Sequence, residues 1–125
     1  MNSRYKIQKK IILRLFIIFS VMLTLVPQAF AQEMPTCPMT LDTLPMCITH
    51  HWESGEISNY GVYISLLTKA NAAIAAQDRV QIKTAINILN AFIGQVTALA
   101  GGQIEDTAAS HMIMHAEAVI QNLQL

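Results

Sequence analysis

The stretch DRVQIKTAINILNAFIGQVTALAGG, residues 78–102, carries the clearest structural signal in the chain. Its apolar side chains recur at intervals of three and four residues, which places them on one helix face for about five turns. Asp78 is expected to cap the start of this helix, and Gly101 and Gly102 to end it. The buried face is expected to consist of Ile82, Ile86, Leu89, Phe92, Ile93, Val96 and Leu99.

Three further helices are predicted around this segment. A short helix over residues 43–54 begins at a Thr43 cap and ends before Gly55. A long helix starts from a Ser or Asn cap at residues 58–59 and runs to about residue 77, and the last helix opens at acidic residues 105–106. Short connections favour antiparallel neighbours. We therefore expect an all-α fold over residues 43–125, a small antiparallel bundle of three long helices plus a short N-terminal helix.

The first 31 residues have the features of a cleavable export signal. Basic residues without any acidic residue occupy residues 1–14, and an uncharged apolar run follows over residues 15–26. Ala29 and Ala31 then provide small side chains at the positions that a signal peptidase reads. A membrane anchor is the alternative, but spanning a bilayer takes about 20 apolar residues and this run is shorter. We expect cleavage after Ala31 and a mature protein that is secreted or periplasmic, without a membrane attachment.

Cys37 and Cys47 are the only cysteines, and both lie beyond the predicted signal. Prolines in and near residues 32–42 indicate an irregular lead-in to the helical part. Two cysteines in an oxidising compartment favour a disulfide, which would staple this lead-in to the short helix. The competing interpretation combines the cysteines with histidines in a metal site, but the long spacing between them is unlike that of a zinc knuckle.

Charge separates the signal from the mature chain. Three basic residues against eight acidic ones remain after residue 31, so the mature net charge is −5. A negative surface repels phosphate backbones and anionic headgroups, so we expect neither nucleic acid nor anionic lipid as a partner. The remaining 94 residues suffice for one domain with a thin core.

His111 and His115 lie four residues apart on the last predicted helix and are therefore neighbours. Helical geometry places both away from its apolar stripe, so we expect a surface pair. Two imidazoles at this spacing can chelate Zn²⁺, Cu²⁺ or Ni²⁺ weakly, and a stable site needs further ligands. If the short helix packs beside the last one, it offers His50, His51, Glu53 and Glu56. The alternatives are an interface and surface histidines without a role.

The end of the short helix combines an aromatic side chain with ionisable ones, a mixture typical of contact surfaces. Trp52, the only tryptophan, shares a helix face with Leu44 and Ile48, so burial in the core is the alternative. Because unperturbed imidazoles become charged near pH 6.5, binding at such a surface would depend on pH. The predicted contact site consists of His50, His51, Trp52, Glu53, His111 and His115.

No arrangement of residues indicates catalysis. The serines do not lie in a recognisable nucleophile turn, and Asp42, Asp78 and Asp106 lie where helix caps are expected. We therefore expect a protein that is not an enzyme and has no cofactor beyond weakly bound Zn²⁺, Cu²⁺ or Ni²⁺.

An ordered set of short motifs resembles a known family. The motifs are ISNYG at residues 57–61, SLL at 65–67, LNAFIGQV at 89–96 and GQI at 102–104. Together with the last helix they resemble the FIMAH-type domain of secreted bacterial proteins over about residues 56–123. The resemblance implies a compact helical module of exported bacterial envelope proteins, without a defined catalytic role. We expect a non-enzymatic binding or accessory module that contacts a protein or an envelope polymer. The oligomeric state is not indicated.

Overall fold

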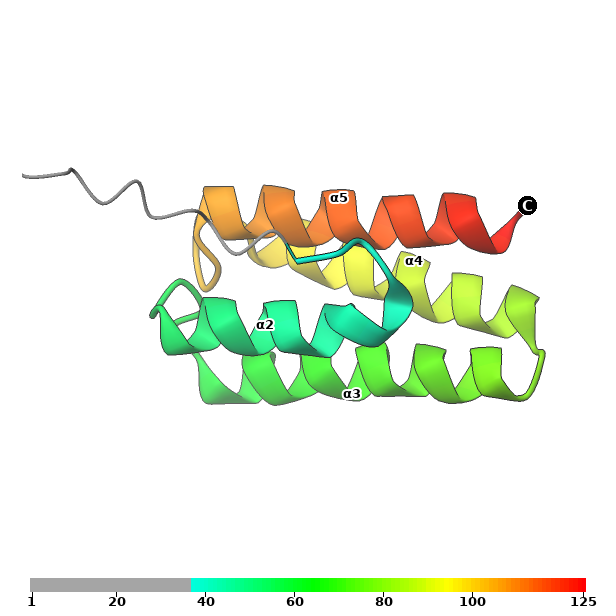
Figure 1. Ribbon diagram of the computed structural model, residues 1–125. Coiled ribbons are helices and arrows are strands. Elements are labelled where there is room, and N and C mark those ends of the chain that lie inside the picture. Colours follow the sequence, from blue (N-terminus) through cyan, green and yellow to red (C-terminus); the bar gives the residue numbers. More distant parts are fainter. Residues whose placement is uncertain (1–36) are drawn as a thin grey trace, which may run out of the picture. The chain divides into compact units, whose positions relative to one another are not determined.

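The computed structural model describes residues 37–125. The predicted signal over residues 1–31 and the first part of the lead-in lie outside the described residues. A short 3-10 helix precedes four α-helices, and no strand occurs in the part of the chain that is described (Figure 1). The all-α prediction, with three long helices and a shorter N-terminal one, is confirmed. In chain order the elements are η1 (Leu41–Thr43), α2 (Leu44–Glu53), α3 (Tyr60–Asp78), α4 (Ile82–Leu99) and α5 (Asp106–Leu123).

Most helix ends follow the expected local rules. The side chain of Asn59 accepts a hydrogen bond from the backbone N–H of Val62, which caps the start of α3. Gly55 and Gly101, with φ of 78° and 72°, adopt the left-handed conformation after α2 and α4. The acidic first turn of α5 also agrees with the prediction.

The start of α4 differs from the prediction. Helix α3 continues through Asp78, so this residue does not cap α4, and Gln81 stands before Ile82 instead. The α3–α4 turn closes with hydrogen bonds from Val80 N to Gln77 O and from Gln81 N to Ala76 O, while Val80 has φ 58°. This is the left-handed C-terminal motif that usually contains glycine, and a valine in its place gives the sequence no stop signal there.

The helices pack as a ring in which each contacts two others. Helix α4 packs against α3 and α5, and α2 packs against the same two helices on the other side (Figure 1). Helix α3 contributes mainly small residues to the core, namely Ala70, Ala73 and Ala76, which let its neighbours approach closely. The largest fully buried side chains include Phe92, Leu44, Ile48, Leu66, Leu89 and Met112.

Helix α4 is the one described helix whose length and apolar composition would also suit a membrane span. Its buried residues Ala85, Leu89, Phe92 and Val96 face the bundle core, and Ile88, Ile93 and Leu99 pack against that core. These contacts account for the apolar pattern by helix packing, because the face of a bundle helix shows the same periodicity.

The lead-in segment is attached covalently and by a buried side chain. A disulfide joins Cys37 to Cys47 in α2, as predicted, and brings their Cα atoms to 6.2 Å. Leu41 is buried, and residues 41–42, which were expected to be irregular, form the η1 turn together with Thr43. The Thr43 side chain donates to backbone oxygens of the lead-in, including that of Pro38, and does not cap α2.

Candidate functional site

The C-terminal end of α2 is organised around His51. Its backbone oxygen accepts hydrogen bonds from the N–H groups of Glu56 and Ile57, at 3.0 and 3.3 Å, and so closes the turn after Gly55. The same turn returns the Glu56 side chain to the His51 ring, where Oε2 lies 2.7 Å from Nδ1. Because a carboxylate only accepts hydrogen bonds, Nδ1–H of His51 is the donor.

This pair continues into a chain of hydrogen bonds that joins α2 to α5. Nε2 of the buried His51 ring lies 2.9 Å from Nδ1 of His111. In a neutral His51 ring whose Nδ1 carries the proton, Nε2 is an acceptor, so Nδ1–H of His111 donates to it. With His51 neutral, the order Glu56, His51, His111 defines both tautomers, and Nε2 of His111 is the nitrogen without a proton.

The environment of His111 changes its pKa. Burial lowers the pKa of His111 below its usual value, and the neighbouring His51, His115 and His50 lower it further. Glu56 acts in the opposite direction. The lowered pKa keeps the His111 ring itself neutral down to a lower pH than a free imidazole.

The prediction that His111 and His115 form a surface pair is wrong, because His115 is fully buried. Its Nε2–H donates to the Thr40 carbonyl oxygen at 2.8 Å, while its Nδ1 has no hydrogen-bond partner among the described residues. The expectation treated α5 as a helix with one covered face. The lead-in and α2 cover a second face of α5, which encloses His115 but leaves His111 half-buried.

The predicted metal pair is therefore divided between two environments. Chelation by His111 and His115 together would require His115 to give up the Thr40 carbonyl and turn out of the core. Over residues 37–125, no group of three or more His, Cys, Asp or Glu side chains is placed to hold a metal ion.

Three aromatic rings form a cluster beside this histidine chain, at the junction of α2 and α3. Trp52 stacks on Tyr63 with ring centroids 5.0 Å apart and an interplanar angle of 12°, and the Tyr60 ring meets Trp52 edge-on at 5.7 Å. The Tyr63 hydroxyl lies 3.3 Å from the Thr49 hydroxyl. Trp52 is half-buried rather than enclosed in the core, and Tyr60 is 63% exposed. We call Trp52, Tyr60 and Tyr63 the aromatic patch.

Only some of the predicted contact residues are therefore close to one another in the structure. His51 and His111 are in contact, and the His50 ring is 5.9 Å from that of His51. Glu53 is exposed beside Trp52, whereas His115 is inaccessible. The prediction did not include Tyr60 and Tyr63, although the short loop between α2 and α3 returns the chain so that the first turn of α3 meets the last turn of α2.

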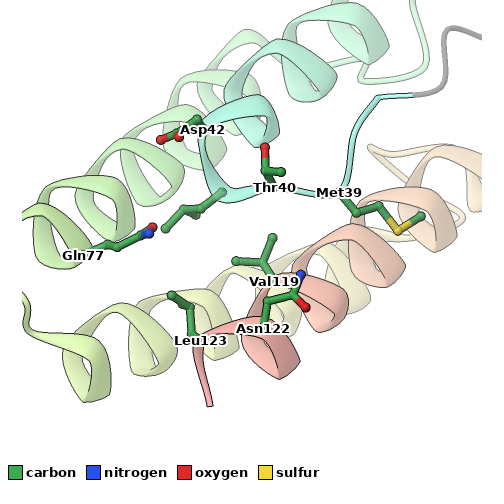
Figure 2. A pocket seen from close by; sticks show the side chains of 8 residues that line it. Met39, Thr40, Asp42, Gln77, Val119, Asn122 and Leu123 are labelled. Carbon is green, nitrogen blue, oxygen red and sulfur yellow. The ribbon is translucent and has the colours of Figure 1, made fainter. Parts of the chain in front are cut away.

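A separate small cleft lies beside η1, where α2 is too short to cover the ends of α3 and α5. Figure 2 shows its lining by the lead-in, Gln77 of α3 and the last turns of α5. Its volume is about 210 Å³, less than the 300 Å³ or so at which small-molecule sites begin. None of the predicted contact residues lines it. The lining residues are Met39, Thr40, Leu41, Asp42, Gln77, Val119, Asn122 and Leu123.

Comparison with known proteins adds no relative to this description: no family model, no curated protein and no solved structure matches the chain.

Proposed function

We propose that the protein is a non-enzymatic, extracytoplasmic binding or accessory module, and that the aromatic patch is its contact surface. The observation that carries this proposal is that the rings of Trp52 and Tyr60 are partly exposed to solvent. Trp52 is half-buried between tyrosines, and most of the Tyr60 side chain faces solvent. Rigid aromatic side chains with polar tips provide contact area at a low entropic cost, and they are enriched where binding energy is concentrated.

The surroundings of the patch support a contact surface over a cofactor site. Glu53, which follows Trp52 in the chain, is exposed, and interfaces often combine an apolar centre with a polar rim. The sequence resemblance to FIMAH-type domains is in keeping with this class, since it implies a compact helical module of exported proteins without a defined catalytic role.

The proposed compartment rests on the predicted signal and on the cysteines. The Cys37–Cys47 disulfide is compatible with an oxidising, extracytoplasmic location. Mass spectrometry of the protein purified from its native source should find Gln32 as the first residue. An intact N-terminus on a membrane-bound protein would instead favour the anchor.

The contact surface is tested by capture from an extracytoplasmic extract with immobilised mature protein. Tyr60→Ala removes an exposed ring from the patch and should reduce capture measurably while circular dichroism stays unchanged. Val80→Ala is the matched control, because Val80 is an apolar side chain, 81% exposed, at the opposite end of α3. Equal capture by the Tyr60→Ala and Val80→Ala proteins would refute the aromatic patch as the contact surface.

A further inference from the structure

The charges of the mature protein are unevenly distributed along the bundle. Four carboxylates occupy the end that bears the aromatic patch, and three of them, Glu53, Glu105 and Asp106, are exposed. The α2–α3 and α4–α5 loops meet at this end, since Glu105 N donates to Glu56 O at 2.9 Å and Ile57 bridges to Ile104. The aromatic patch and the carboxylates therefore lie at the same end of the bundle.

The basic residues lie elsewhere. Arg79 and Lys83 flank the turn at the far end of α3, and a helix of 19 residues is about 28 Å long. Lys69 lies nine residues beyond Tyr60 and is directed to α4, with Nζ 2.7 Å from Oε1 of Gln95. Beyond the predicted signal the chain has no other lysine or arginine, so neither residue type occurs at the patch end.

We infer that the partner of the aromatic patch is a basic protein segment, whose arginine or lysine side chains lie against the Tyr60 and Trp52 rings within reach of Glu53 and Glu105. The inference rests on the proposed function and names the chemistry of its partner. A cation over an aromatic face gains about 0.5–1 kcal/mol at an exposed site. The carboxylates add long-range attraction, which raises the rate of encounter with a cationic segment.

Other partners fit these observations less well. An anionic polymer would be repelled by the exposed carboxylates. A neutral saccharide would stack on the tyrosine ring but gain nothing from the uneven charge. Arginine suits the surface best, because its planar guanidinium stacks on an aromatic ring and also donates hydrogen bonds to carboxylates.

The test uses the oxidised mature protein and a short peptide of alternating arginine and glycine. A glutamate–glycine peptide and a short neutral oligosaccharide serve as comparison probes. Trp52 is the only tryptophan, so its fluorescence reports binding at the patch directly. We expect the arginine peptide alone to bind, with an affinity that falls about tenfold between low salt and about 200 mM salt, because screening shortens the range of the attraction.

Matched variants separate the patch from the general negative charge of the protein. Glu53→Gln with Glu105→Gln should weaken the arginine peptide about tenfold at low salt. Tyr60→Ala should weaken it about two- to fivefold, the loss of one exposed cation–aromatic contact. Asp78→Asn with Glu117→Gln, which changes the net charge equally at exposed positions off the patch, should have little effect.

Three outcomes would overturn the inference. Absence of peptide binding, or equal weakening by the two double variants, would show that the patch does not select a cationic partner. Salt-independent binding of the neutral oligosaccharide, lost in the Tyr60→Ala protein, would also reject the basic partner, but it would leave the patch as the contact surface of the proposed function. The capture experiment above decides that function separately.

Discussion

Replacing His115 with leucine should leave the protein as stable as before or make it more stable. His115 is fully buried, and among residues 37–125 its Nε2–H donates to the Thr40 carbonyl oxygen while its Nδ1 has no hydrogen-bond partner. The Thr40 carbonyl does not depend on this bond, since it also accepts from the backbone N–H of Thr43 at 3.3 Å. Leucine therefore removes an unsatisfied nitrogen without creating an unsatisfied oxygen.

The expected change follows from two opposing contributions. Loss of the hydrogen bond to Thr40 costs about 0.5–1.5 kcal/mol, and removal of the unpartnered Nδ1 recovers about 1–3 kcal/mol. The free energy of unfolding should then change by between about −0.5 and +2.5 kcal/mol, which is no significant loss or a gain. His115→Ala removes the same polar groups but leaves a cavity, so it should destabilise the protein by about 2–5 kcal/mol.

Urea unfolding of the oxidised mature protein, followed by circular dichroism near pH 7.5, measures both variants. Equal urea dependence of the unfolding free energy in wild-type and variant proteins would show that the unfolded states are comparable. A loss of more than about 1.5 kcal/mol on His115→Leu, as large as the whole hydrogen-bond contribution, would refute the reasoning. It would mean that Nδ1 has a partner, such as a bound water molecule, that leucine displaces.

Three further outcomes are expected from the same stability assay. Replacing Cys37 and Cys47 with serine should lower the free energy of unfolding by about 2.7 kcal/mol, because a cross-link between residues 10 apart reduces the entropy of the unfolded chain by that amount. An unchanged unfolding midpoint after reduction of the wild-type protein would contradict this prediction. The free energy of unfolding should fall as the pH decreases below about 6.5, because the pKa of His111 is lowered in the folded protein and its ring is protonated more readily in the unfolded chain. His111→Gln should reduce this pH dependence of the unfolding free energy. An unchanged pH dependence in that variant would show that other groups cause it. Val80→Gly should raise the free energy of unfolding by about 1 kcal/mol, because Val80 is exposed and its φ of 58° is a left-handed conformation that glycine adopts without strain. A lower free energy of unfolding would show that the valine side chain makes a contact that outweighs the backbone strain.

Local sequence signals predicted the helices because the features that start, extend and end a helix depend on residues that are close in the chain. The apolar spacing in α4, the Asn59 cap and the glycine stops act within one or two turns, and all three are present. The error at Asp78 has the same origin. An aspartate resembles a cap in isolation, but the turn after α3 is closed by hydrogen bonds to Gln77 and Ala76 that a left-handed Val80 permits.

The candidate site was harder to predict because its contacts link distant segments. His51 and His111 are 60 residues apart, and His115 meets Thr40 across 75 residues. A helical wheel describes one helix and one apolar direction. It does not show that the lead-in crosses α5, so it assigned His115 to the surface. The aromatic patch shows the same limit on a smaller scale, since Trp52 and Tyr63 stack across the α2–α3 loop.

These contacts explain how a helix of only 10 residues is held in one position, although isolated helices of this length are marginal in water. The Cys37–Cys47 disulfide fixes its first turn to the lead-in, and the chain from Glu56 through His51 to His111 fixes its last turns to α5. Trp52 lies next to His51, so the bonds that hold the end of α2 also determine where the indole meets Tyr63. A partner at the aromatic patch would therefore find a surface that is already organised, and less conformational entropy would be lost on binding.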